Sequence, residues 1–212
     1  RKIISVLKFL VKRIRQKFPQ TKIRFRADAG FSIPRLYDYL EGEDIEYAIG
    51  LITNSKLIEA NEKHIEKAKQ SYDKTKQKQR LFRSFLYQAG TWSKARKVVA
   101  KAEHTKLGPN NRFVVTNSKA VGKAIYDGFY VQRGNSENWI KEIKNGFSCD
   151  RLSCHRFIAN QFRLMLTVAA HQLIQHLMLL LKGTTLEVAS IETIRIKLIK
   201  VAARVHQTVR KI

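Results

Sequence analysis

Acidic residues are scarce in this 212-residue chain, which contains 17 Asp and Glu against 41 Lys and Arg. The first 26 residues contain no acidic residue at all, and after Arg151 the only two are Glu187 and Glu192. The formal net charge is therefore +24. An excess of this size argues against an ordinary enzyme of small molecules. It indicates a polyanionic partner, most often a nucleic acid and less often an anionic membrane surface.

Cysteine is also nearly absent, since Cys149 and Cys154 are the only two. Two thiols do not make a zinc site by themselves, and no histidine pair supplies the spacing of a zinc finger. His171 and His176 are five residues apart, whereas a helical zinc pair is four apart. We therefore expect free thiols in a reducing cytosol and a cytoplasmic protein.

No signal peptide is visible in the sequence, since no apolar segment near the N-terminus precedes a small-residue cleavage site. Its most apolar run, Leu164 to Leu181, is long enough to suggest a membrane span. Polar residues interrupt the run, and a base flanks each end, which favours a buried core helix and no membrane partner. These residues are His171, Gln172, Gln175 and His176 within the run, and Arg163 and Lys182 beside it.

The periodicity of the first 52 residues predicts alternating helices and strands. Residues 1–18 have apolar residues at helical spacing, with bases on the other face. Residues 21–27 alternate apolar and basic residues, as strands do. Ser32 can cap a short helix that has Pro34 in its first turn, and residues 45–52 form an apolar strand. This order indicates an α/β fold, and we assign residues 1–52 to a partial core.

Residues 53–117 are predicted to form an inserted subdomain of one helix and an antiparallel sheet, with strands at 81–87, 97–102 and 112–116. Residues 118–212 are predicted to be helical, with helices at about 119–144, 154–181 and 186–201 and a short strand at 203–212. Gly128 and Gly134 weaken the first of these helices.

One constellation of residues, in the segment YVQRGNSENWIKEIK, points to a chemistry. On a uniform helix of about 100° per residue, four of its side chains share one face, and Lys141 joins them. A carboxylate among cations and a phenol suits a phosphate-binding stripe that contains one metal ligand. Gly134 would let a sugar-phosphate backbone come close. The four residues are Tyr130, Arg133, Glu137 and Lys144.

The spacing Tyr-x2-Arg-x3-Glu-x6-Lys resembles the signature of the DDE transposases of the insertion-sequence 4 superfamily. The wider text is similar to one branch of it, the bacterial insertion-sequence 1380 family, from about residue 20 to the C-terminus. The blocks that carry the resemblance are FRADAGF (25–31), KQRLF (78–82), KAEHTK (101–106), RFVVTN (112–117), YVQRGNSEN (130–138), SCHRFIANQFRLML (153–166) and IRIKLIKVAARV (194–205).

The resemblance implies a ribonuclease H-like, retroviral integrase-like catalytic core that cleaves DNA and transfers strands. Asp28 would be its second catalytic aspartate and Glu137 its catalytic glutamate, and both would bind metal. Two Mg²⁺ or Mn²⁺ ions about 3.5–4 Å apart would stabilise the attacking and the leaving oxygen. Arg133 and Lys144 would clamp phosphates, with support from Tyr130. The implied partners are the terminal inverted repeats of a transposon, a target DNA and a second copy of the chain, near the bacterial nucleoid.

The chain departs from the family pattern at the first of the three carboxylates, because its first acidic residue of any kind is Asp28. The chain also begins with Arg. We therefore expect a fragment, a frameshifted copy or a decayed element that cannot cleave DNA alone.

Less specific interpretations stay open. By itself, Asp28 would be a cap or turn residue, and Glu137 a solvated or ion-paired helix residue. Trp92, near Lys94 and Arg96, could stack on an unpaired or flipped base, or could pack in the core. For the whole chain, the alternatives are a non-catalytic DNA-binding remnant or regulator, a metal nuclease of the same fold, and a basic membrane-surface protein.

Overall fold

The computed structural model describes residues 2–203. The chain divides into two compact units, Arg1–Gly134 (unit 1) and Asn135–Ile212 (unit 2). Each unit is described by itself. All but the first residue of the strand expected at 203–212 lies outside the described residues.

Unit 1 is built on a six-stranded mixed sheet in the order β1-β2-β6-β4-β3, with β5 paired to β4. The pair β1–β2 is parallel, and all the other pairs are antiparallel. The strands are β1 (Arg24–Ala27), β2 (Glu46–Leu51), β3 (Gln79–Tyr87), β4 (Arg96–Thr105), β5 (Gly108–Pro109) and β6 (Arg112–Thr116). The helical elements are α1 (Lys2–Lys17), η1 (Ala29–Phe31), α2 (Pro34–Gly42), α3 (Ser55–Thr75), η2 (Ala124–Tyr130) and η3 (Val131–Arg133).

The helices of unit 1 begin where the local chemistry favours it. The helix predicted at residues 1–18 is confirmed as α1, whose residue Val11 is 5% exposed in the core. The side chain of Asn54 caps α3 by accepting from the Leu57 N–H at 2.9 Å. The cap predicted at Ser32 is wrong. Its hydroxyl instead lies 2.7 Å from the Tyr37 hydroxyl, and Ile33 precedes α2 without a side-chain cap.

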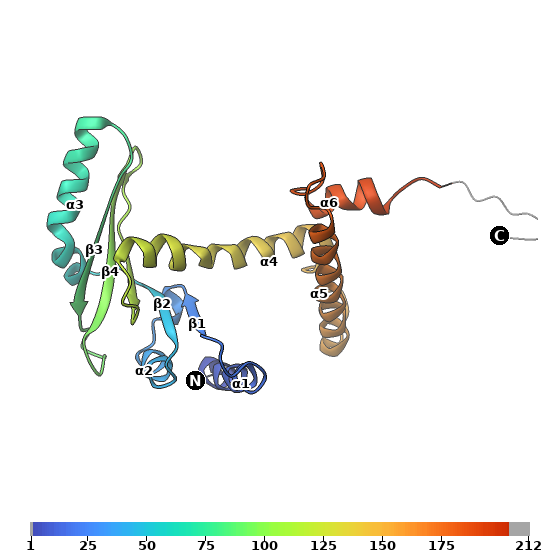
Figure 1. Ribbon diagram of the computed structural model, residues 1–212, viewed down its shortest axis with the longest axis horizontal. Helices are drawn as coiled ribbons and strands as arrows, with labels where there is room; N and C mark the ends of the chain where they lie inside the picture. The colour runs from blue at the N-terminus through green and yellow to red at the C-terminus, as the bar shows by residue number, and fades with distance from the viewer. Residues whose placement is uncertain (1, 204–212) are drawn as a thin grey trace, which may run out of the picture. The chain divides into compact units, whose positions relative to one another are not determined.

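The sheet is covered on both faces, because its strands alternate between two hydrophobic clusters. On β2, Tyr47 and Ile49 face the cluster that includes Leu36, Leu40 and Leu57 of the helices α2 and α3. Ala48 faces the other cluster, which contains Ile125, Tyr126 and Phe129 of η2. Figure 1 shows α3 running alongside β3 and β4. The mixed α/β class predicted from the sequence is confirmed in this form.

The strands predicted for the insertion join the same sheet as β1 and β2. Their connection is the antiparallel pairing of β6 with β2, from Ala48↔Thr116 to Leu51↔Phe113. The predicted boundaries at residues 52 and 117 therefore both fall within unit 1. The three-part domain division stays a prediction.

A uniform helix at residues 119–144 is a wrong prediction. The segment is a π-helix, η2, followed by a 3₁₀ turn, η3, and then α4 (Gly134–Phe147). The N–H of Val131 bonds to the carbonyl of Tyr126, five residues back, which is the π pattern. Gly128 lies within η2 and Gly134 begins α4, so the interruptions occur at the two weak points of the pattern.

Unit 2 contains α4, α5 (Phe157–Leu180), a single turn α6 (Ile191–Ile194) and a π-helical turn η4 (Arg195–Ile199). The buried His171 of α5 lies 3.5 Å from Glu142 and packs edge-on against Phe147, both on α4. The helix predicted at 154–181 is confirmed as α5, but a fully buried core helix is wrong, since Phe162 is 62% exposed. The helix predicted at 186–201 is shorter than expected.

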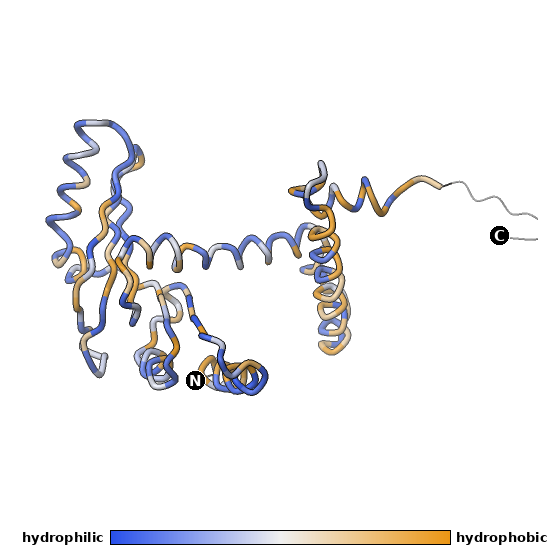
Figure 2. The backbone as a smooth tube through the Cα atoms, in the orientation of Figure 1, coloured by the Kyte–Doolittle hydropathy of each residue, from blue (hydrophilic) through white to orange (hydrophobic). Residues whose placement is uncertain are grey.

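The hydropathy of the two long helices differs, as Figure 2 shows: α3 is mostly hydrophilic and α5 is largely hydrophobic. Within residues 2–203, no helix meets the length and apolarity that a membrane crossing requires.

Candidate functional site

Asp28 stands directly after β1, at the carboxyl end of the parallel strand pair. Its backbone is extended, with φ −77° and ψ −177°, so the alternation of β1 continues through it. Its exposed side chain therefore leaves the sheet on the same face as Arg24 and Arg26. One carboxylate oxygen, Oδ1, accepts from the Gly30 N–H at 2.9 Å and caps η1. A carboxylate has about four lone-pair sites, so this cap leaves room for a metal ligand bond.

Tyr130, the first residue of the four-residue motif, lies beside Asp28 in unit 1. The contact is made over Gly50 of β2. A Cβ atom built on Gly50 would stand 2.6 Å from the Tyr130 hydroxyl oxygen, 3.1 Å from the Ala29 nitrogen and 3.4 Å from the Asp28 carbonyl carbon. The first separation is shorter than real Cβ contacts and the second is tight, so a side chain at position 50 would displace the end of the Tyr130 side chain. Two parts of the chain about a hundred residues apart therefore converge at the end of β1.

Two arginines of β1 hold the end of η2 in this position. Arg26 Nη1 donates to the Phe129 carbonyl at 3.5 Å. The Arg24 guanidinium carbon lies 3.9 Å from the centre of the Phe129 ring, and its Nε is 2.6 Å from Glu46 Oε2. Since Phe129 immediately precedes Tyr130, these contacts also position the tyrosine. The result is a cationic rim along β1 that ends at Asp28.

The rest of the motif is divided between the two units. Arg133 belongs to unit 1, where its guanidinium carbon lies 5.8 Å from the Tyr130 ring centre. Glu137, Lys141 and Lys144 are exposed residues of α4 in unit 2. Because α4 is a regular α-helix, these three share one face within it, as expected. The pairing of Asp28 with Glu137 joins the two units and stays a prediction.

The residue types fit a hard divalent cation. Mg²⁺ prefers oxygen ligands, retains several waters and is often bound by one or two carboxylates. Among residues 2–203, no group of three or more His, Cys, Asp or Glu side chains gathers closely enough to hold a metal ion. A site built on Asp28 would therefore draw its further oxygen ligands from water, DNA phosphates and more distant carboxylates.

Trp92 does not offer a ring face to a base. It is 7% exposed and packs edge-on against Tyr37 and Tyr87, at ring-centre distances of 5.3 and 5.6 Å. The Arg96 guanidinium lies 5.7 Å from its ring centre. Core packing is therefore the correct one of its two interpretations, and base stacking is the wrong one.

Gly50 and Arg26 are the residues of this site that the sequence analysis missed. A signal for Gly50 was present, because an isolated glycine within an apolar strand often marks the close approach of another backbone or side chain. Arg26 looked like one of many bases, and only its bond to Phe129 distinguishes it.

Comparison with known proteins gives one match. The model of a family described as transposase DDE domain group 1 matches residues 1–212. Neither a curated protein nor a solved structure matches the chain.

Proposed function

The chain belongs to the transposase DDE domain family, group 1. From this membership we propose that Asp28 and Glu137 belong to the metal site with which such a transposase cuts and rejoins DNA. We also propose that this chain alone does not cleave DNA, because no acidic residue precedes Asp28 to act as the first of the three carboxylates. At the family level it is a DNA transposase. We further propose a ribonuclease H-like core and the bacterial insertion-sequence 1380 branch of the insertion-sequence 4 superfamily, on the sequence blocks quoted above.

The convergence of Asp28 and Tyr130 over Gly50 is the observation that carries the proposal. The motif predicts that Tyr130 belongs to the active site. Its hydroxyl lies close to the turn of the proposed metal ligand, although the two are far apart in sequence.

The proposed roles follow from charge and position. Asp28 and Glu137 would supply carboxylate oxygens to two Mg²⁺ or Mn²⁺ ions. Such ions would supply charge stabilisation for both oxygens of an in-line phosphodiester displacement. Asp28 is held in place by its bond to the Gly30 N–H, and Tyr130 by the arginine contacts to Phe129.

The motif cations Arg133, Lys141 and Lys144 would hold phosphates of the transposon end. A guanidinium binds phosphate with two parallel hydrogen bonds, and a lysine acts as a point charge. The proposed partners are the terminal inverted repeats and a target duplex, in a complex of two copies of the chain on DNA of the bacterial nucleoid.

Metal binding is the sharpest first test, because it does not depend on the identity of the DNA ends. Mn²⁺ affinity would be measured by calorimetry for the wild-type chain, Asp28→Asn, Glu137→Gln and the double variant. If both carboxylates hold the same ions, each single variant loses most of the affinity and the double variant loses little more. Glu62→Gln on the exposed face of α3 is the control and should bind as wild type does.

Independent losses that add up in the double variant would contradict a shared site. A second assay would follow nicking and strand transfer on a plasmid that carries the DNA flanking the gene. We expect no products from this chain alone. Metal-dependent products that require Asp28 and Glu137 would support the transposase site and would contradict the proposed inactivity of the chain. Binding of DNA with neither metal binding nor cleavage would favour the alternative, a non-catalytic DNA-binding remnant or regulator.

A further inference from the structure

A second basic surface lies in unit 1, away from the four-residue motif. It consists of two adjoining hollows, of about 590 and 600 Å³, that share Arg15. The first lies between α1 and α2, and the second continues to the amino end of β1. We call the two together the α1–β1 groove. Four of its cations are Lys8 and Lys12 in the first hollow and Lys22 and Lys119 in the second.

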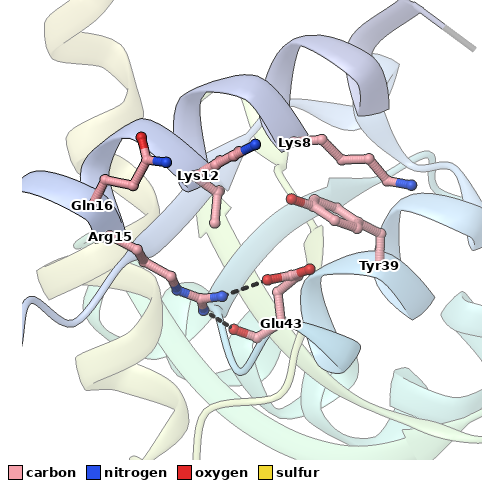
Figure 3. Close-up of a pocket in the computed structure, with 7 residues that line it drawn as sticks. Lys8, Lys12, Arg15, Gln16, Tyr39 and Glu43 are labelled. Carbon is pink, nitrogen blue, oxygen red and sulfur yellow. Dashed lines mark hydrogen bonds and ion pairs between the residues drawn. The ribbon is translucent and has the colours of Figure 1, made fainter. Parts of the chain in front are cut away.

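The first hollow is shaped by α1, as Figure 3 shows. Lys8, Lys12 and Arg15 lie within about 60° of one another on the helix and extend over about 10 Å along its axis. The Lys8 ammonium lies 5.8 Å from the Tyr39 ring centre. Arg15 bonds to the Glu43 carboxylate and to its main-chain carbonyl, and so fixes α1 against the end of α2.

The charge of the groove stays positive after its internal ion pairs are counted. Arg15 pairs with Glu43, and Arg24 pairs with Glu46. Asp44 is the remaining carboxylate of the lining. Within residues 2–203, no carboxylate pairs with Lys8, Lys12, Lys22 or Lys119. Four cations therefore face one carboxylate, which is an arrangement that attracts a polyanion.

The groove lies on the flank of the proposed active site. Arg24, in the second hollow, begins β1, and Asp28 directly follows that strand, so the two Cα atoms lie roughly 13 Å apart at about 3.3 Å per residue. This is well within one turn of a DNA duplex, which rises about 34 Å. A single duplex that contacts the second hollow can therefore also place one of its phosphates at Asp28.

An anionic membrane could bind the same cations, but membrane binding by a helix also requires an apolar face that is free to enter the lipid. An interfacial helix inserts its apolar face into the lipid. The main apolar stripe of α1, with Ile4, Leu7 and Val11, instead packs on the core of unit 1. Exposed apolar side chains also remain on α1, among them Val6, Phe9 and Leu10, so binding to vesicles is tested below.

From these observations we propose that the α1–β1 groove binds the phosphate backbone of double-stranded DNA beside the reactive phosphate. The proposal rests on the proposed function for the identity of the polyanion. It adds a DNA contact that lies outside the four-residue motif and carries no sequence specificity, because only phosphates are contacted.

The test compares two variants with the same loss of charge. In the groove variant, Lys8, Lys12, Lys22 and Lys119 become Gln. In the control variant, four exposed lysines of α3 become Gln: Lys56, Lys63, Lys67 and Lys69. The affinity of each for a short DNA duplex is measured by fluorescence anisotropy over a series of salt concentrations, with circular dichroism to check folding.

The logarithm of the affinity falls linearly with the logarithm of salt, by about 0.9 for each phosphate contact. The groove variant should lose up to about 3.6 of this slope for four contacts, and the control variant should match wild type. Equal losses in both variants would overturn the groove and leave only a general charge effect. An unchanged groove variant would also overturn it.

Vesicles that contain phosphatidylserine provide the remaining arm. If the groove variant loses vesicle binding and keeps DNA binding, the surface serves a membrane and the proposal is wrong. If the wild-type chain binds no duplex at all, the proposed function itself fails. If the wild-type chain binds DNA and the groove variant binds equally well, the groove proposal is wrong but the proposed function is not affected.

Discussion

The two units of the chain place their share of the proposed active site on very different supports. Asp28, Gly50 and Tyr130 lie on the six-stranded sheet of unit 1, between elements that contribute to both hydrophobic clusters of the described residues. Glu137 lies in the first turn of α4 in unit 2, where apolar side chains of α5 are largely exposed.

This difference indicates a division of labour. A sheet with a core on each face holds Asp28 and Tyr130 to a fixed geometry, as a metal ligand and its neighbour require. A helical unit with little internal core is held less firmly, since buried apolar area supplies most of the stability of a fold. The predictions below test the contrast from its largest effect to its smallest.

Removal of a central core side chain of unit 1 should have the largest effect. Phe113 of β6 is 1% exposed and contacts the cluster between the sheet and its helices. Phe113→Ala should lower the free energy of unfolding of unit 1 by about 3–5 kcal/mol, because it leaves a cavity. The measurement is urea unfolding followed by Trp92 fluorescence in a Trp139→Phe background, since these are the two tryptophans of the chain. A cost below about 1 kcal/mol would show that the core repacks.

A second prediction concerns how much the ion pairs of Glu103 contribute to the stability of unit 1. The Glu103 carboxylate is 4% exposed and forms ion pairs with Lys101 at 2.9 Å and Lys78 at 3.0 Å. It also accepts a hydrogen bond from the Asn110 amide at 2.7 Å. Burial raises its pKa, but the bonds from these cations and the amide outweigh burial and lower the pKa to about 2. Glu103→Gln should cost about 3 kcal/mol at neutral pH, since one pKa unit corresponds to about 1.4 kcal/mol.

The sign of the pH dependence follows from this lowered pKa. The contribution of Glu103 is complete above about pH 4.5, the ordinary value, and is lost as pH falls towards 2. The difference in stability between wild type and Glu103→Gln should shrink over that window. Glu192→Gln in unit 2 is the matched control. Its pair with Arg195 is 3.3 Å long, its side chain is 57% exposed, and the change should be within about 0.5 kcal/mol.

The sequence was sufficient for most of the longer helices and strands of unit 1, because their signals are local. Alternation of apolar and basic residues located β1, an apolar run located β2, and strand-like segments between turn residues located β3, β4 and β6. The amphipathic pattern located α1. The motif at residues 130–144 was equally visible, since it depends on spacing alone. Pairing of β6 with β2 depends on contacts between distant segments, which no local pattern encodes.

The irregular helical segments η2 and η3 were also missed because they depend on contacts between distant segments. The angles predicted for Tyr130 and Arg133 assumed 100° per residue from Tyr130 onward, but η2 and η3 are π and 3₁₀ segments. Packing of Ile125, Tyr126 and Phe129 on the sheet favours this irregular path over helix propensity. Trp92 was ambiguous for a related reason, because only the fold shows that Tyr37 and Tyr87 enclose it.

The glycine at the contact between Asp28 and Tyr130 gives an intermediate effect. Gly50→Ala would force the Tyr130 hydroxyl away from β2, at a cost of about 1–3 kcal/mol for overpacking, and should weaken Mn²⁺ binding. Because the shortest approach is to the hydroxyl, Tyr130→Phe in the Gly50→Ala background should recover part of the stability. If the second change makes the protein less stable instead, the clash is with the backbone of Ala29 and Tyr130 is not the partner.

The smallest effect is expected for α5, and a larger one would contradict the contrast between the cores of the two units. Phe162 is 62% exposed, so Phe162→Ala should change the opening free energy of α5, measured by hydrogen exchange, by less than about 1 kcal/mol. A loss as large as that of Phe113→Ala would mean that this face is covered in solution. Since residues 164–181 carry no charge in a chain of net charge +24, two copies could meet there without like-charge repulsion. In that case, dilution would lower the hydrogen-exchange protection of α5 in the wild-type chain but would not change it in Phe162→Ala. Unit 2 would then be stabilised by association of two copies and not by its own core.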